Sequence, residues 1–360
     1  MTARDLANCR LVNQQIAQSR CQTPGQVVAR LGAMQAQDYP GALWSIGLRL
    51  PKATLAEVEQ AIAARTIVRT WPMRGTLHFV AAADVRWMLE LLTPRIVQGR
   101  AARHVELGLD PAVLARCEKL LVKALEGGRQ RTRGELMTLL ERAGISTAQQ
   151  RGYAILWHLA HAGVLCFSCH QGKQPAFALL EEWVPKAKRL TCDEALAELA
   201  LRYFTGHGPA TLHDFVWWSG LKVADAKAGL ALVSEQLAEE HVEGVAYWMP
   251  RNTPDLRDAS PTAYLLPGFD EYLLGYTDRA AALDPRHAQK VAPGGNGVFK
   301  PTLVMDGRVA GLWRRAIKKN AVLITPAPFA RFKKNETLAL AEPVTRYGQF
   351  HGRSAALAKH

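Results

Sequence analysis

Residues 132–180 read TRGELMTLLERAGISTAQQRGYAILWHLAHAGVLCFSCHQGKQPAFALL, and they contain the clearest structural motif of the 360-residue chain. Thr132 and Glu135 have the spacing of a capping box, in which each side chain satisfies a main-chain amide of the other residue. Leucines then recur at helical spacing as far as Gly144, where the glycine is expected to end the helix. The stretch therefore opens with a short, well-capped helix.

A second helix is expected to open at Ser146 and to end at Gly163, because apolar residues recur at helical spacing between them. Residues 164–168 and 176–180 are short, strand-like apolar runs on either side of a polar loop. Helix, tight turn, helix and hairpin in this order predict a winged helix-turn-helix.

The same pattern recurs toward the N-terminus. Thr23 followed by proline is typical of a helix start, and Thr54 with Glu57 forms another capping box. The apolar runs 67–71 and 75–80 are predicted to supply the two strands of a wing.

A further copy is expected after residue 206, with one helix ending at Gly220 and another over residues 223–233. We therefore predict an α+β fold, mainly α, of tandem winged helix-turn-helix units. The expected segments are three winged-helix units at residues 1–120, 121–190 and 191–255, and a basic β-rich region at residues 256–360.

The C-terminal region contains a strong hairpin signal. Asp306-Gly307 lies between the strand-like runs 298–305 and 308–313, and this dipeptide suits the type I′ turn, which needs positive φ at both central residues. A third strand is expected over residues 321–325. We predict a small antiparallel sheet with an antiparallel hairpin that carries several basic side chains.

The positive charge of the chain is concentrated in this same region. The net charge is +13, and residues 286–360 hold 14 Lys and Arg against three acidic residues. A basic face concentrated in one region is typical of a protein that binds a polyanion, although a solvated surface that keeps the protein soluble is the alternative. We therefore expect a nucleic acid or another polyanion as the partner.

Five residues with metal-binding side chains lie close together in the central copy: His158, His161, Cys166, Cys169 and His170. The string CFSCH also has the CxxCH spacing of a haem attachment site, but attachment requires export, and no export signal is apparent. A structural zinc site needs four converging ligands, whereas side chains alternate along a strand. We expect no metal and no cofactor, with these residues serving the wing and its helix.

The six cysteines are too few for a disulfide scaffold in a chain of this length. No run approaches the roughly 20 apolar residues of a membrane span. We expect a cytoplasmic, nucleoid-associated monomer with no membrane partner.

Several segments resemble the bacterial winged-helix DNA glycosylases, the family that includes the azinomycin-resistance enzyme AlkZ and the interstrand-crosslink enzyme YcaQ. The resemblance is carried in order along the chain by MQAQD (34–38), MRGTLHFV (73–80), LCFSCHQGKQPAFALLEEWVP (165–185), GHGPATLHDFVWWSGL (206–221), LLPGFDEYLLGYTDR (265–279) and VMDGRVAGLWRR (304–315).

The family's catalytic signature is Gln, an apolar residue and Gln in the azinomycin-resistance type, and it has Asp at the last position in the crosslink type. Gln35-Ala36-Gln37 matches the first type, so the resemblance implies that Gln35 and Gln37 are catalytic. It also implies a basic DNA channel lined by winged helices and a β-hairpin that engages the duplex. The wing departs from the family in carrying Cys166, Cys169 and His170, which leaves the choice of lesion open.

Two neutral amides cannot act as strong general bases, but they can hold and orient a water molecule. An N7- or N3-alkylated purine already carries positive charge and leaves readily. Positioning of the water molecule and fixed dipoles can then provide much of the remaining reduction of the activation barrier. We therefore expect a monofunctional hydrolase of the N-glycosidic bond of cationic alkylated purines in duplex DNA. The side chains expected to contact DNA are Arg74, His78, Arg279, Arg308, Arg314, Arg315, Lys318 and Lys319.

The alternative is a non-catalytic winged-helix DNA-binding protein or transcriptional regulator. A regulator is typically a short chain with a dimerisation element, whereas this chain joins several units. The sequence leaves open which adduct is preferred and whether interstrand crosslinks are unhooked.

Overall fold

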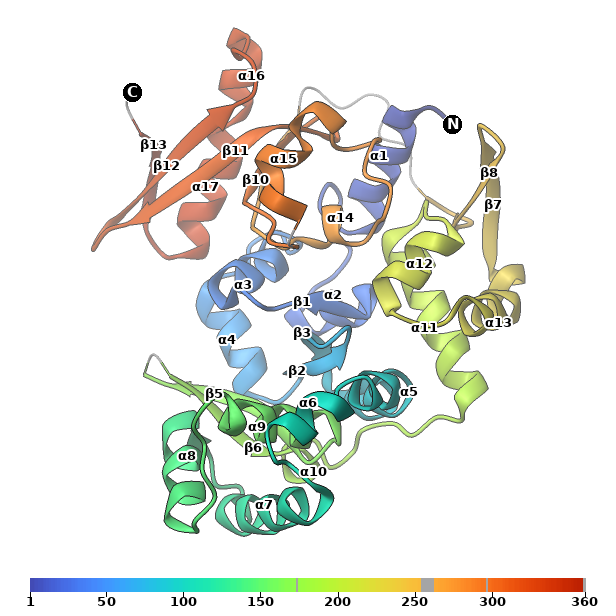
Figure 1. Ribbon diagram of the computed structural model, residues 1–360. Helices are drawn as coiled ribbons and strands as arrows, with labels where there is room; N and C mark the ends of the chain where they lie inside the picture. Colours follow the sequence, from blue (N-terminus) through green and yellow to red (C-terminus); the bar gives the residue numbers. More distant parts are fainter. Residues whose placement is uncertain (173, 254–261, 296, 359–360) are drawn as a thin grey trace. The chain divides into compact units, whose positions relative to one another are not determined.

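The computed structural model describes residues 1–172, 174–253, 262–295 and 297–358. The chain forms two compact units: unit 1 is Met1–Val58 with Leu196–His360, and unit 2 is Glu59–Ala195 (Figure 1). The four segments expected from the sequence were defined by repeated motifs, whereas these two units are defined by compactness. The four segments therefore stay a prediction. The expected boundary at residues 255 and 256 lies outside the described residues.

Unit 2 is built on a sheet in which strands β3, β2, β5, β6 and β4 follow one another. The hairpins β2–β3 and β5–β6 are antiparallel, and they meet through β2 and β5, where Arg69 lies opposite Phe167. Its strands and longer helices are β2 Ile67–Met73, β3 Thr76–Ala81, α5 Val85–Gln98, α6 Ala101–Glu106, α7 Pro111–Leu125, β4 Arg131–Thr132, α8 Arg133–Arg142, α9 Arg151–His161, β5 Leu165–Gln171, β6 Gln174–Leu179 and α10 Leu180–Trp183.

The central motif forms the expected helix, helix and hairpin. The capping box of Thr132 and Glu135 opens α8, and Gly144 has the positive φ of a glycine that ends a helix. The expected start of the second helix at Ser146 is wrong, because α9 begins only at Arg151. Thr147 instead donates through its main-chain amide and its hydroxyl to Glu141, which anchors the turn.

Apolar side chains from α7, α8, α9, β2, β5 and β6 form the core of unit 2. Trp71, Trp157 and Phe167 are among its largest members, and Trp71 lies 5.0 Å from Phe167 between ring centroids. Burying these rings removes a large apolar area from water, which is the main stabilising term for a small unit.

Unit 1 combines the N-terminal helices with the chain from Leu196 onward, which includes most of α11. The elements of the N-terminal part are α1 Ala3–Asn13, α2 Pro24–Leu31, β1 Ala33–Gln35, α3 Tyr39–Gly47 and α4 Leu55–Ala63, the last of which runs on into unit 2. The later elements are α11 Cys192–His207, α12 Leu212–Ser219, α13 Val223–Val233, β7 Leu237–Val242, β8 Val245–Pro250, β9 Ala263–Leu266, α14 Glu271–Leu274, α15 Ala288–Val291, β10 Thr302–Met305, β11 Arg308–Ile317, β12 Ala321–Pro328, α16 Lys334–Ala339, α17 Ala341–Phe350 and β13 Ser354–Leu357.

The expected helices of the later copy are present. Thr211 and Asp214 form a capping box for α12, and Gly220 ends it in the left-handed conformation. Helix α13 follows, and the antiparallel hairpin β7–β8, which the sequence did not reveal, turns through Glu243 and Gly244, both with positive φ.

The C-terminal sheet has the strand order β13-β12-β11-β10-β9. All its pairs are antiparallel except β12 with β13. Asp306 and Gly307 both have positive φ (46° and 79°), which confirms the predicted two-residue turn between β10 and β11. Both classes of secondary structure are thus extensive, and the expected α+β class is confirmed.

Three aromatic side chains join helix α3 to this sheet. Trp44 of α3 lies 4.8 Å from Tyr347 of α17, and Tyr347 lies 5.2 Å from Trp313 of β11, both between ring centroids. The indole N–H of Trp44 also donates to the carbonyl of Leu265 in β9 at 2.7 Å. The segment just before α3 is thereby held in fixed relation to the strand that carries Arg314 and Arg315.

No helix among the described residues is both long and apolar enough to span a bilayer.

Candidate active site

The Gln35-Ala36-Gln37 segment lies in a short connection between two helices. Helix α2 ends at Gly32, whose φ of 75° turns the chain into β1, and α3 begins at Tyr39 with a proline in its first turn. Ala36 is fully buried, Gln35 is 9% exposed, and Gln37 is exposed. The buried alanine anchors the segment and leaves Gln37 accessible to a ligand.

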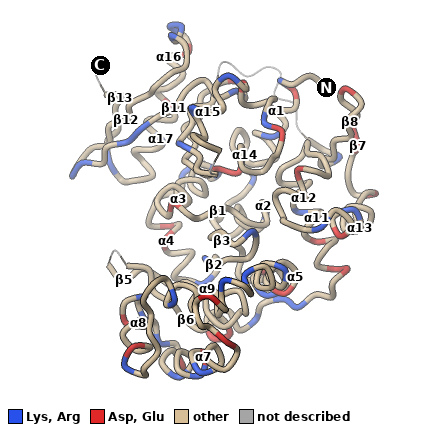
Figure 2. The backbone as a smooth tube through the Cα atoms, in the orientation of Figure 1, with Lys and Arg blue, Asp and Glu red and all other residues tan. Residues whose placement is uncertain are grey.

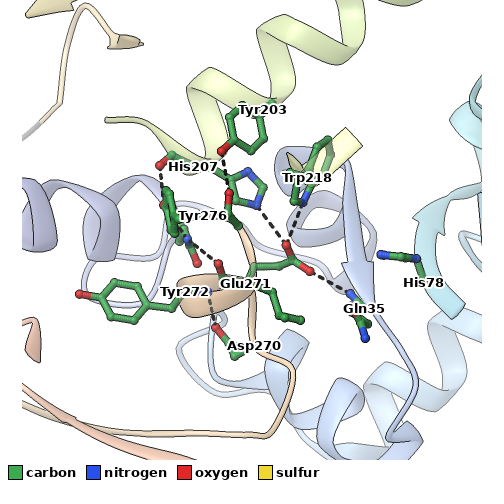
Figure 3. Close-up of polar contacts among 12 residues, drawn as sticks. Gln35, His78, Tyr203, His207, Trp218, Asp270, Glu271, Tyr272 and Tyr276 are labelled. Atoms are coloured by element: carbon green, nitrogen blue, oxygen red, sulfur yellow. Dashed lines mark hydrogen bonds and ion pairs between the residues drawn. The ribbon is translucent and has the colours of Figure 1, made fainter. Parts of the chain in front are cut away.

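A buried carboxylate lies against the main chain of Gln35. The Gln35 N–H donates to Oε1 of Glu271 at 2.9 Å, and Glu271 is 1% exposed (Figure 3). The other oxygen, Oε2, lies 2.9 Å from the indole nitrogen of Trp218 and 3.3 Å from Nε2 of His207. Both oxygens of Glu271 are therefore engaged in the interior of unit 1.

A second set of buried polar groups contacts the main chain of Glu271 and its neighbours. The amide nitrogen of Gln14 donates to the carbonyl of Glu271 at 3.3 Å and to the hydroxyl of Tyr276 at 3.0 Å, and that hydroxyl donates to the carbonyl of His207. Arg49 donates to Oε1 of Gln14 at 2.9 Å. Because these buried polar groups are hydrogen-bonded, they avoid the desolvation penalty of unpaired groups and favour a single arrangement of the side chains.

Sequence reasoning missed Glu271, His207 and Trp218 as site residues. The available signal was the pair Asp270-Glu271 within LLPGFDEYLLGY, since two adjacent acids in an apolar run predict buried, partnered carboxylates.

Arg74 and His78, expected to contact DNA, lie together on the β2–β3 hairpin of unit 2. Arg74 occupies the turn with a φ of 53°, and its guanidinium lies 3.3 Å from Nε2 of His78. The Nδ1 of His78 lies 2.9 Å from the carbonyl of Thr76, so a proton on Nδ1 makes Nε2 an acceptor for Arg74. His78 is fully buried and Arg74 is half-buried, so the ring orients the guanidinium.

The remaining basic candidates lie in unit 1, mostly along the β11–β12 hairpin. Figure 2 shows Lys and Arg gathered along this hairpin toward its tip. Arg308, Arg314, Lys318 and Lys319 are exposed, whereas Arg315 is half-buried. The hairpin therefore presents a row of cations to solvent.

The tip of this hairpin is tied to the C-terminal segment. Arg353 donates to the carbonyl of Lys319 at 3.2 Å, and the hydroxyl of Ser354 donates to the carbonyl of Asn320 at 3.1 Å. These bonds fix the direction of a loop whose lysines would otherwise move freely.

Arg279 is half-buried and supports the local fold. Its Nε donates to the carbonyl of Leu273 at 2.7 Å, and its guanidinium lies 5.1 Å from the ring centroid of Phe299. These contacts hold the chain after α14.

The β7–β8 hairpin has the opposite charge. Its exposed side chains include Glu239, Glu240 and Glu243. A hairpin with this surface repels phosphates, so the β11–β12 hairpin is the better candidate for DNA contact in unit 1.

Cys166, Cys169 and His170 lie on β5, and the described residues contain no group of three or more side chains that could hold a metal ion. Cys166 is fully buried, and burial raises the pKa of its thiol well above the usual range. Burial also raises the pKa of Cys169. These thiols are poor nucleophiles and poor ligands as they stand, because the reactive form is the thiolate.

Comparison with known proteins identifies the family. The family described as "DNA glycosylase AlkZ-like" matches residues 28–350. The "Interstrand DNA cross-link repair glycosylase" of Streptomyces sahachiroi is 28% identical over 335 residues, which cover 88% of each chain. The solved structure of the Streptomyces sahachiroi DNA glycosylase AlkZ has the same fold, with a TM-score of 0.81, 24% identity, and coverage of 99% of this chain and 100% of that one. The chain belongs to the AlkZ-like family of DNA glycosylases, and it is an enzyme that acts on DNA.

Proposed function

We propose that this DNA glycosylase is monofunctional and hydrolyses the N-glycosidic bond of cationic N7- or N3-alkylated purines in duplex DNA. The observation that carries the proposal is the geometry of the Gln-Ala-Gln segment. Its first glutamine is fixed by a buried carboxylate, its second is exposed, and unit 1 also contains the basic hairpin.

In the proposed reaction, the bond between C1′ and the purine nitrogen breaks and its electron pair neutralises the cationic base. The oxygen of a water molecule bonds to C1′, and one proton passes to solvent. The Gln amides hold this water through their carbonyl oxygens and place their dipoles against the cationic sugar. An uncharged purine lacks this leaving-group advantage, so the site spares normal bases.

No lysine lies within the Gln35–Gln37 segment. A lyase step would need an amine to form a Schiff base with the sugar. The proposed product is therefore an intact strand with an abasic site.

The DNA contacts proposed for unit 1 are Arg308, Arg314, Arg315, Lys318 and Lys319 on the β11–β12 hairpin, and Arg279 in the segment after α14. Arg74, oriented by His78, supplies a contact from unit 2. We further propose that helices α8 and α9 with β5–β6, and helices α12 and α13 with β7–β8, are winged helix-turn-helix units in a tandem array. The enzyme is proposed to act as a monomer on DNA of the cytoplasmic nucleoid.

Interstrand crosslinks are a second proposed substrate. The curated relative from Streptomyces sahachiroi is named for the repair of such crosslinks. A crosslink through purine N7 leaves the same cationic base as a simple N7 adduct, so the same chemistry applies.

The test is base release from DNA methylated at N7 of guanine. We expect free N7-methylguanine, an abasic site and an unbroken strand until alkali is added, with no release from undamaged DNA. Strand breakage without alkali, or no base release from any alkylated duplex, would overturn the proposal.

A further inference from the structure

We propose that Glu271 is a positioning residue of the glycosylase site, which sets the direction of the Gln35-Ala36-Gln37 segment through the Gln35 amide. This inference rests on the proposed function of the two glutamines and deepens it. Glu271 lies 236 residues further along the chain than Gln35, so the contact joins two segments that the sequence keeps far apart.

The two oxygens of Glu271 have different partners. Oε2 faces the framework, where Trp218 donates at 2.9 Å and His207 approaches at 3.3 Å. Oε1 faces the candidate catalytic segment and accepts the Gln35 N–H at 2.9 Å (Figure 3). The carboxylate therefore transmits the rigidity of helices α11 and α12 to the Gln-Ala-Gln segment.

His207 is packed so that only one of its nitrogens faces the carboxylate. A Cβ added at Gly275 would lie 2.7 Å from Cδ2 of His207, so the glycine allows this close packing of the ring. Within the described part of the chain, Nδ1 of His207 has no hydrogen-bond partner. A neutral ring with its proton on Nε2 fits both observations, and it then donates to Oε2.

Fixing the Gln35 amide also fixes the accessible glutamine. Gln37 follows directly after the end of β1, with only the buried Ala36 between it and Gln35, so a rotation of the main chain at Gln35 also moves Gln37. A misplacement of about 1 Å in such a site can reduce the rate about 10²-fold without weakening binding.

The carboxamide variant Glu271→Gln provides a sharp test because it has only one oxygen. If that oxygen faces Trp218, the NH2 group faces the Gln35 N–H, and two donors meet there. If the oxygen faces Gln35, the NH2 group faces the indole N–H of Trp218, and two donors meet at that position instead. Trp218→Phe removes the competing indole donor. In the double variant the oxygen can face Gln35, while the NH2 group donates to His207 carrying its proton on Nδ1.

We expect Glu271→Gln to reduce single-turnover base release by about 10- to 100-fold, with DNA affinity within about threefold of the wild type. The double variant Glu271→Gln/Trp218→Phe is expected to recover to within about threefold of Trp218→Phe alone. A merely structural role predicts the opposite order, since the double variant loses more buried contacts than either single one.

Asp84 provides the matched control, because it is also a buried carboxylate that accepts from an indole. Its Oδ1 accepts from the indole N–H of Trp87 at 3.1 Å, and it belongs to unit 2. Asp84→Asn is expected to lower the melting temperature while base release stays within about twofold of the wild type.

Hydrogen exchange of the Gln35 amide gives a readout that does not need activity. We expect slow exchange in the wild type, about tenfold faster exchange in Glu271→Gln, and slow exchange again in the double variant. Unchanged exchange at Gln35 in Glu271→Gln would overturn the inference. An inactive wild type with the expected exchange pattern would contradict only the proposed function.

Discussion

Arg49 and Asp270 form a two-armed ion pair in the interior of unit 1. Nη1 of Arg49 lies 2.8 Å from Oδ2 of Asp270, and Nη2 lies 2.9 Å from Oδ1. The side chains are 0% and 3% exposed. Asp270 also accepts the amide of Tyr272 and so caps α14, the helix that begins with Glu271. The ion pair therefore holds the helix from which Glu271 reaches the Gln35 amide.

Breaking this pair should destabilise unit 1 strongly. Arg49→Met leaves Asp270 buried without its guanidinium, and such a loss costs about 3–5 kcal/mol. Chemical denaturation should show a lower midpoint with an unchanged slope. The exposed pair Arg103–Glu106 offers a control, because Arg103→Met should cost less than about 1 kcal/mol. Equal losses from both variants would contradict the interpretation.

Unit 2 should lose stability in acid through His161. This ring is 2% exposed, and burial lowers its pKa to about 4. The hydrogen bond to the Trp157 carbonyl opposes this shift, whereas the positive charges of His158 and Arg100 add to it. In the unfolded chain the pKa returns to about 6.5, so between pH 6.5 and 4 the unfolded state binds the extra proton. Stability conferred by the neutral ring is therefore complete above pH 6.5 and is lost as the pH falls toward 4.

His161 should change the free energy of unfolding by at most about 1.4 kcal/mol per pH unit between pH 6.5 and 4. His161→Asn retains an amide that can donate to the carbonyl of Trp157, as Nδ1 does at 2.8 Å, but it does not titrate. The free energy of unfolding of this variant should depend less on pH between 4 and 6.5. An identical dependence in both proteins would show that His161 does not cause it.

The two lysines at the tip of the β11–β12 hairpin should contribute to DNA affinity without sequence preference. If each contacts one phosphate, Lys318→Ala/Lys319→Ala should reduce the slope of log K against log salt by about 2. Binding of labelled duplexes at several salt concentrations measures this slope.

Lys119 and Lys123 of α7 are the matched control, since both are exposed and their replacement by alanine removes the same charge. We expect the salt slope of Lys119→Ala/Lys123→Ala to stay near that of the wild type. A slope reduced equally by both double variants would mean that net charge, rather than the hairpin, governs binding.

Much of the local structure follows from the sequence because local rules act within a few residues. The capping boxes at Thr54 and Thr132 and the turn at Asp306-Gly307 are present as predicted. The start of α9 was misplaced because Glu141 competes for the amide of Thr147, a side-chain contact that periodicity does not reveal. The hairpin β7–β8 was missed because its outward side chains are acidic and its apolar alternation is weak.

The candidate site was only partly accessible from the sequence. Gln35 and Gln37 emerged from the resemblance, since a polar turn has no distinctive pattern. Glu271 could not be assigned to them, because the contact depends on the fold bringing together segments 236 residues apart. The basic charge of this region was predictable, since charge is a property of neighbouring residues. The predicted turn at Asp306-Gly307 joins β10 to β11, however, whereas Lys318 and Lys319 lie at the other end of β11, in the turn to β12.

In the proposed reaction, two uncharged side chains suffice for cleavage of a bond to a cationic base. Single-turnover release of N7-methylguanine should be measured for the wild type and for Gln35→Ala/Gln37→Ala, each shown to be folded and saturated with DNA. We expect the double variant to bind the duplex normally and to lose base release by at least about 10²-fold. Release at the wild-type rate by the folded, DNA-bound double variant would contradict the account.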